Sequence, residues 1–295
     1  MINKLIILVF CFLAVCTAHG QETAPNYLMY RYNMNILNPA YAGVNAATEV
    51  GFGFRKQSLD FSGASETQYA SISMPYKNNI GLGASLINDT QFIRRETSVT
   101  LDVSYKLKID EQTRLYFGMK FGSGVHAIDY SALGVNDPLF SGSQSTFSPK
   151  VGLGTYLKGN HYFFSLSIPN VVLSEIQVPK IDSNGSVISQ RVQEIFQMYA
   201  STGYSFRLSD KLKLNPSVFA RFVSNQDLLM DISTVAGFSN KMELGITYRF
   251  DRSLIGSVML KLHKNTSLGY AYESITSEFS AVVSGTHEFV LRFFW

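Results

Sequence analysis

The chain has 295 residues, of which 46% are hydrophobic and only 16% are charged, and it carries 22 Phe and 16 Tyr. Its 25 Lys and Arg nearly balance its 22 Asp and Glu, so a surface for nucleic acid is not expected. Its two cysteines, Cys11 and Cys16, lie in an N-terminal segment that we expect to be removed, which excludes disulfides and cysteine metal sites from the mature protein.

The first 20 residues have the pattern of a secretory signal peptide. Lys4 supplies a positive charge, residues 5–16 form an apolar run, and Ala18 and Gly20 are the small residues that a signal peptidase reads. We expect cleavage before Gln21. The apolar run is shorter than the ~18 residues of a spanning helix, which favours a cleaved signal over a membrane anchor.

The same segment leaves one alternative open. Leu13, Ala14, Val15 and Cys16 resemble a lipobox, the signal for lipid attachment at a cysteine. Val15 stands where that signal requires Gly or Ala, so we favour plain cleavage.

The middle of the chain alternates strictly between apolar and polar residues. The apolar set is Val99, Leu101, Val103, Tyr105, Leu107 and Ile109, and the alternation resumes over 115–121 after a polar break at 110–112. A period of two indicates β-strands, and each strand approaches the ~9–11 residues that cross a membrane when tilted. We interpret the stretch as a hairpin of a transmembrane barrel, with lipid outside and a wet lumen inside.

This alternation continues from residue 47 to the C-terminus. It predicts strands at 47–57, 64–74, 79–88, 95–109, 113–125, 147–158, 160–168, 193–208, 211–222, 228–237, 240–250, 254–263, 266–274 and 284–295. About fourteen strands is an even number, as a single-chain bacterial barrel requires. The predicted fold class is therefore all-β: a transmembrane antiparallel β-barrel over residues 47–295, located in the outer membrane. A soluble β-sandwich, the alternative, would have shorter strands.

The connections between these strands support the same topology. Every second one is short: 75–78, 110–112, 159, 209–210, 238–239 and 264–265. These are predicted periplasmic turns, whereas 126–146 and 169–192 are predicted surface loops, since barrels have short turns inside and longer loops outside. A hairpin-turn signal at residues 183–186 predicts that two strands continue as a ribbon above the membrane.

The C-terminal strand alternates up to the last residue, through Phe289, Leu291, Phe293 and Trp295. A terminal strand that ends in an aromatic residue resembles the signal that barrel-assembly machinery recognises. The alternative is an ordinary strand that ends in Trp.

Three Gly-x-Gly repeats lie inside predicted strands, at 51–53, 81–83 and 152–154. None opens a helix, so a dinucleotide site is not favoured. We interpret these glycines as relieving crowding where strands curve or where a plug approaches.

The histidines of the mature chain do not form a metal-binding or catalytic pattern. His126, His161, His263 and His287 are scattered without ligand spacing. His263 and Ser257 share a face, but any barrel produces such coincidences. We therefore predict no enzyme activity, no catalytic residues, no metal and no cofactor.

The lumen face is the better candidate for function. By strand parity its charged residues are Arg55, Asp102, Lys106, Lys120, Arg207, Arg221, Glu243, Arg249, Lys261, Glu273 and Arg292. Facing lipid, such charges would cost ~2–4 kcal/mol each at mid-bilayer, which favours the inward placement. They form either a lattice of salt bridges in a closed interior or a polar socket for a polypeptide or solute.

Residues 21–46 are rich in Tyr and Asn and do not alternate, which predicts a segment outside the barrel wall, either periplasmic or in the lumen. This segment contains the motif Asn38, Pro39, Ala40, Tyr41, Ala42 and Gly43. With its lead 33–37 the motif resembles the N-terminal hallmark of the PorP/SprF family of outer-membrane proteins, associated with type IX secretion and gliding motility. Further likeness follows in order at 68–75, 81–89, 137–138, 152–154 and 167–170.

The resemblance implies a barrel that works with secreted surface proteins carrying a type B C-terminal sorting domain, exporting them or anchoring them at the cell surface. It also implies contacts with the type IX machinery and with outer-membrane lipid, and neither catalysis nor a cofactor. The alternative functions are a transport pore, porin-like or for hydrophobic solutes, and a scaffold that acts from the periplasmic side. A pore needs a water-filled lumen, so lumen occupancy separates these hypotheses.

Overall fold

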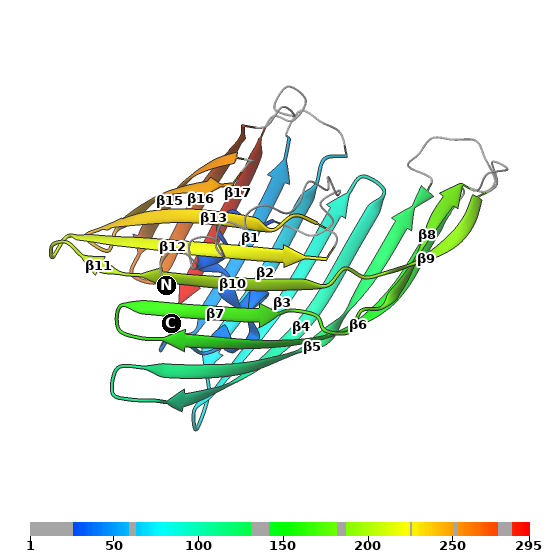
Figure 1. The fold of residues 1–295 in the computed structure, drawn as a ribbon. Coiled ribbons are helices and arrows are strands. Elements are labelled where there is room, and N and C mark those ends of the chain that lie inside the picture. Colours follow the sequence, from blue (N-terminus) through cyan, green and yellow to red (C-terminus); the bar gives the residue numbers. More distant parts are fainter. Residues whose placement is uncertain are drawn as a thin grey trace, which may run out of the picture.

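The computed structural model describes residues 26–58, 63–130, 142–181, 187–224, 226–250, 253–276 and 285–295. The predicted signal peptide lies outside the described residues. Within them the chain forms an antiparallel β-barrel with a short helical segment inside it (Figure 1). No helix in this part of the chain is long and apolar enough to cross a membrane.

The barrel wall uses nearly all of the strands. Its first half is β1 (Glu49–Gln57), β2 (Glu66–Pro75), β3 (Ile80–Gln91), β4 (Arg94–Lys108), β5 (Arg114–Asp129), β6 (Ser143–Lys158) and β7 (Tyr162–Ile168). Its second half is β10 (Gln197–Tyr204), β11 (Phe206–Arg207), β12 (Leu212–Val223), β13 (Leu229–Phe238), β14 (Met242–Arg249), β15 (Ser253–His263), β16 (Thr266–Ile275) and β17 (Thr286–Phe294). Both β10 and β11 pair with β12, so they count as one wall strand. The wall is therefore a closed barrel of 14 strands, which confirms the predicted fold class.

The first and last strands close the barrel. β1 pairs with β17 along its whole length, from Glu49 opposite Phe294 to Gln57 opposite Thr286. Beyond β17, the Trp295 N–H donates to the Thr48 carbonyl at 3.1 Å, and the Thr48 N–H donates to the Trp295 carbonyl at 2.8 Å. The terminal strand thus continues to the last residue, and no sheet edge is left open at the seam.

The strand faces follow the predicted alternation. On β4, Leu101 is 60% exposed and points outward, whereas its neighbours Thr100 and Asp102 are buried. Because the outward face is apolar and the charged side chain of Asp102 is turned inward, the wall is suited to lipid outside and to polar groups inside.

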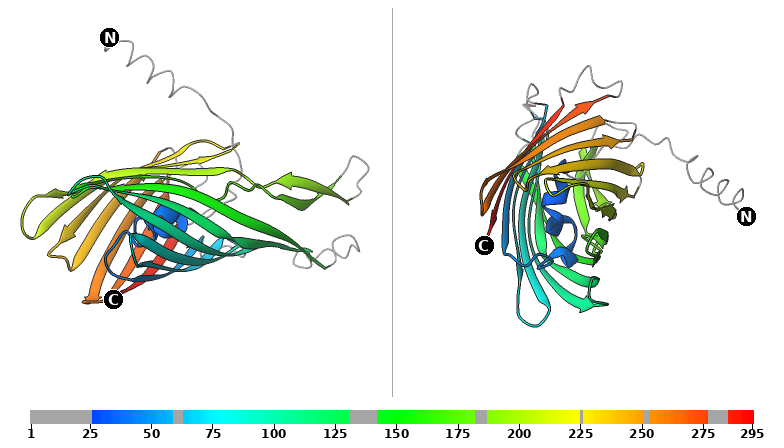
Figure 2. Two further views of the ribbon diagram at one scale, coloured as in Figure 1. Left: turned by 90° about the horizontal axis from the view of Figure 1, so that it is seen from below. Right: turned by 90° about the vertical axis from the view of Figure 1, so that its left-hand side faces the viewer.

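The two ends of the barrel differ. At one end, here called the turn end, lie the short connections 76–79, 109–113, 159–161, 208–211, 239–241 and 264–265, as predicted. At the other, the loop end, a two-stranded ribbon of β8 (Glu175–Ile181) and β9 (Val187–Gln193) projects beyond the wall, as Figure 2 shows at the right of its left-hand panel. By the barrel rule the turn end is the periplasmic one.

Residues 26–46, here called the plug, lie inside the barrel (Figure 2, blue). They form η1 (Tyr30–Tyr32), α2 (Met34–Leu37) and η2 (Pro39–Tyr41). The buried hydrophobic cluster joins the plug to the wall and contains Tyr27, Leu28, Met29, Tyr30, Met34, Ile36, Leu37, Ala40, Val44, Tyr69, Tyr116, Tyr156, Tyr199, Phe219, Ile255, Met259, Ala271 and Val290. The wall residues come from strands all around the barrel, so the hydrophobic core of this protein lies in its lumen.

Charge placed on the outer face should destabilise the barrel according to depth. Leu101→Arg, midway along β4, is expected to cost ~2–4 kcal/mol, and Ile109→Arg at the turn end ~0–1 kcal/mol, because lysine and arginine reach water more easily near the interface. Urea unfolding in lipid vesicles, followed by heat-modifiable migration, measures both, with Leu101→Met as the control. Equal costs for the two arginines would contradict a lipid-facing strand.

Candidate functional site

Asn38 of the family motif fastens the plug to the wall. Its side-chain Nδ2 donates to the Thr155 carbonyl at 2.9 Å and to Ser165 Oγ at 2.8 Å. Its Oδ1 accepts from the Ala40 N–H at 2.9 Å and so caps η2. The backbone of Asn38 is extended, as a residue before proline requires. Asn38 is fully buried, so it acts on the plug and has no surface for a partner.

The end of the motif passes very close to the wall. The Ala42 carbonyl accepts from Ser104 Oγ at 2.5 Å, and the Gly43 N–H donates to Ser73 Oγ at 3.0 Å. Gly43 has a φ of +67°, and a Cβ there would lie 2.7 Å from the Gly81 Cα. Only glycine combines that backbone conformation with so close an approach.

Wall glycines make room for the plug from the other side. A Cβ on Gly154 would lie 2.0 Å from Asn38 Oδ1, one on Gly118 2.1 Å from the Ala40 nitrogen, and one on Gly81 2.0 Å from the Ala42 carbonyl oxygen. The interpretation that Gly-x-Gly strands accommodate a plug is confirmed for Gly81 and Gly154.

Glu288 holds the start of the plug and was missed in the sequence analysis. Its carboxylate accepts from the Leu28 N–H at 2.6 Å and from Tyr69 Oη at 2.7 Å, and it is fully buried. It lies directly opposite Arg55 in the pairing of β1 with β17. Strand parity could have found it, because it stands in the same alternation as Arg292.

Buried ion pairs lie on the inner face of the wall on two sides of the lumen. On β4 and β5, Lys120 Nζ lies 2.8 Å from Asp102 Oδ1, and these residues are opposite one another in register. On the far side of the barrel, Arg249 binds both oxygens of Asp231 at 2.9 Å and Glu273 Oε1 at 2.6 Å. Burying a charge is costly, and in these clusters an opposite charge lies close enough to offset part of that cost.

The predicted lumen residues therefore divide into groups. Six of them are buried in the lumen: Arg55, Asp102, Lys120, Arg221, Arg249 and Glu273. Glu243 is half-buried and accepts from Tyr32 Oη of the plug at 2.5 Å, and half-buried Arg292 binds Glu49 at 3.3 Å. Lys106, Arg207 and Lys261 share the inward parity but lie at the turn end, separate from these clusters.

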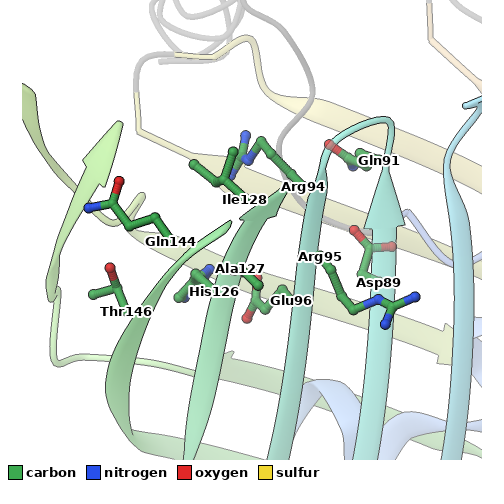
Figure 3. A pocket seen from close by; sticks show the side chains of 10 residues that line it. All are labelled: Asp89, Gln91, Arg94, Arg95, Glu96, His126, Ala127, Ile128, Gln144 and Thr146. Atoms are coloured by element: carbon green, nitrogen blue, oxygen red, sulfur yellow. Dashed lines mark ion pairs between the residues drawn. The ribbon is translucent and has the colours of Figure 1, made fainter. Parts of the chain in front are cut away.

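A recess of about 200 Å³ lies between the plug and the loop end. Its apolar lining includes Tyr27, Ile36 and Leu37 of the plug, and its charged lining consists of Asp89, Glu96, Lys120, His126, Lys150 and Glu194. A smaller adjoining pocket shares Asp89, Glu96 and His126 with it (Figure 3). Strand parity predicts that most of these charged residues point inward. Glu194, however, comes from the loop before β10, so strand parity does not predict that it joins the others.

Glu194, just after the ribbon, organises this recess. Its Oε1 accepts from His126 Nε2 at 2.8 Å and from Ser148 Oγ at 2.7 Å, and its Oε2 accepts from Asn170 Nδ2 and from the Ser174 N–H. Burial disfavours the charged carboxylate, but the hydrogen bonds from His126, Ser148 and Ser174 outweigh it and lower the pKa of Glu194. The carboxylate therefore ties the base of the ribbon to β5 and β6.

We expect Asn38→Ala to loosen the plug while the wall stays folded. The change leaves buried acceptors on Thr155 and Ser165 without their donor, at a cost of ~1–3 kcal/mol. Trypsin cleavage after Arg31 in the plug should become faster, and single-channel recordings should show openings that the parent protein lacks. Gln68→Ala, on the outer face, is the control; equal cleavage in all three proteins would contradict this anchoring role.

Acid should release the Glu194 interactions. Because the folded pKa lies below the ordinary value near 4.5, the stabilisation is complete above about pH 4.5 and is lost as the pH falls through the folded pKa. The Glu194 amide, which donates to the Ser174 carbonyl at 2.8 Å, should be protected from hydrogen exchange at pH 7 and lose protection progressively as the pH is lowered below 4.5, after correction for intrinsic rates. In Glu194→Ala the amide should be unprotected at every pH. Protection that does not depend on pH would contradict the prediction.

Comparison with a solved structure supports the fold. A Pseudomonas aeruginosa FadL homologue aligns with a TM-score of 0.50 and 12% identity, covering 94% of this chain and 95% of that one. At this identity the likeness concerns the fold alone. The Acinetobacter baumannii outer membrane protein Omp33 aligns with a TM-score of 0.49 and 10% identity, covering 86% of this chain and 100% of that one. A search of curated proteins finds no match.

The family comparison covers nearly the whole chain. Residues 19–293 match the model of the type IX secretion system membrane protein PorP/SprF. The match agrees with the closed barrel, and it indicates an outer-membrane protein associated with type IX secretion. The chain belongs to the PorP/SprF family of type IX secretion system membrane proteins.

Proposed function

We propose that this barrel binds a secreted adhesin-like protein through that protein's type B C-terminal sorting domain, for type IX export or for anchoring at the cell surface. The observation that supports the proposal best is the plug. It is hydrogen-bonded to the wall through Asn38, Glu288 and Ser104, and it packs against strands around the whole barrel. A lumen occupied in this way favours a binding role over free passage of solutes.

The loop end supplies the surface for such a partner. The recess of about 200 Å³ is smaller than the ~300–1,000 Å³ typical of small-molecule pockets, so its size suits one or two inserted side chains. The ribbon of β8 and β9 pairs with no other strand of the described chain and stands beside this recess. A partner that docks on the loop end would therefore meet both features.

The competing function is a transport pore, because a barrel of 14 strands can enclose a channel. The two functions differ in the state of the lumen. A pore must displace the plug each time it transports a solute, whereas a binding protein keeps the plug in place.

The decisive experiment is affinity purification of the protein from native outer membranes in mild detergent, followed by identification of what accompanies it. We expect a large secreted protein joined through its C-terminal region. A barrel that purifies alone and conducts in a planar bilayer would instead support the pore.

Removal of the ribbon tests where the partner binds. Since the Glu194 N–H donates to the Ser174 carbonyl, residues 175–193 can be replaced by a two-residue Asn-Gly turn without moving the wall. We expect this variant to form a heat-modifiable barrel that retains little of the secreted partner, as measured by quantitative mass spectrometry. The control is Gln68→Ala, and full retention by the ribbon-less barrel would contradict docking at this end.

A further inference from the structure

Basic side chains stand directly opposite one another at the turn end. The strand register pairs Lys108 with Arg114 and Arg114 with Lys158 across β4, β5 and β6. It also pairs Arg207 of β11 with Lys213 of β12. Like charges directly opposite in a sheet are destabilising, so this arrangement needs an explanation other than stability.

These five residues, here called the cationic arc, form two groups on one stretch of the turn-end rim. In the sheet order only β7 separates the group on β4 to β6 from the group on β11 and β12. Lys158 is opposite Phe163 of β7, and Phe163 is opposite Gly203 of β10, so Arg207 stands four residues further along its strand than the row of Lys158. All five also stand in the inward alternation: Arg114 with buried Tyr116, Lys158 with buried Tyr156. At the same level the outward residues are apolar and exposed, as at Leu107 and Leu208. The arc therefore lines the inner side of the turn-end rim and does not face lipid.

The nearby acids balance only part of this charge. The pKa of the exposed Asp110 carboxyl is lowered by hydrogen bonds from the Gln112 and Thr113 N–H groups and, to a smaller degree, by nearby Arg114, so Arg114 has one acid within electrostatic range. Glu111 binds Lys108 at 2.5 Å and Asp210 binds Arg207 at 2.8 Å, but both are exposed pairs three residues apart, which contribute little. Lys158 Nζ is engaged by the plug, at 3.0 Å from Asn45 Oδ1. Within the part of the chain that the structure describes, neither Arg114 nor Lys213 forms an ion pair.

We propose that the cationic arc is a docking surface for an acidic, extended segment of a partner polypeptide that approaches from the turn end. The inward direction of the charges favours such a segment over lipid headgroups, which would meet the outer side of the rim. Six neighbouring strands at ~4.8 Å spacing span on the order of 24 Å across the strands, about the length of seven extended residues, and the two groups are also offset by four residues along the strands. This surface lies at the end opposite the recess, so it is independent of the proposed binding of a secreted protein.

The test uses the full mature protein in nanodiscs of zwitterionic lipid and a fluorescent peptide of seven glutamates. We expect salt-dependent binding by fluorescence anisotropy, weakened at least tenfold in the double variant Arg114→Gln, Lys213→Gln. The matched control is Lys241→Gln, Lys264→Gln, which removes the same charge from exposed turn-end positions outside the arc. The control should change the affinity less than twofold, and heat-modifiable migration verifies that both variants are folded.

Three results would overturn the proposal. Absence of peptide binding by the parent protein is the first, and an equal loss in both double variants, which reports net charge alone, is the second. The third is unchanged peptide binding in the arc variant together with loss of a co-purified anionic phospholipid, which would show a lipid-binding surface. Because the peptide binds at the turn end, none of these results depends on whether a secreted protein binds at the loop end.

Discussion

The constraint on which the structure depends is that the plug's main chain is buried in the lumen without a strand to pair with. A buried peptide group without a partner is costly. The plug's short helices pair many of its own peptide groups, and side chains of the wall supply partners for others. Ser104 and Ser167 donate to the Ala42 and Leu37 carbonyls, Glu288 accepts from the Leu28 N–H, and Asn38 pairs in the opposite direction, from plug to wall. These contacts explain why serines and glycines are frequent on the inner face. Small hydroxyl side chains donate at short range, and glycines let the plug come near enough to be reached.

The plug also divides the lumen, so that the two ends of the barrel are separate surfaces. It separates the turn end, with its arc of basic residues, from the recess toward the loop end, which Glu194 joins to the ribbon. Each end then offers its own polar surface to a different compartment. Membership in the PorP/SprF family fits such a division, since a protein of a secretion system meets both machinery and cargo.

Sequence patterns predicted the wall well because side-chain alternation has only one structural solution in a membrane. A slip of one residue would turn every charge toward lipid, so strand parity identified Asp102, Lys120 and Arg249 as inward. The same rule also places Glu288 and Asp231 inward, although the sequence analysis did not name them. Strand parity does not tell how far along the barrel axis a residue lies. Arg207 and Lys261 have the inward parity yet are exposed, because they stand where the strands end. The motif at residues 38–43 was recognised in the sequence, but the contacts by which it anchors the plug were not predicted.

The sequence by itself determined the barrel, its strand count, the extent of the terminal strand and the short turns at one end, because each rests on local periodicity and turn chemistry. Only the tertiary structure decided that residues 26–46 lie in the lumen, that Asn38 reaches Ser165 and that Glu194 meets His126. Those contacts join residues far apart in the chain. They depend on barrel curvature and on which strands face each other across the lumen, and alternation along one strand carries no information about either.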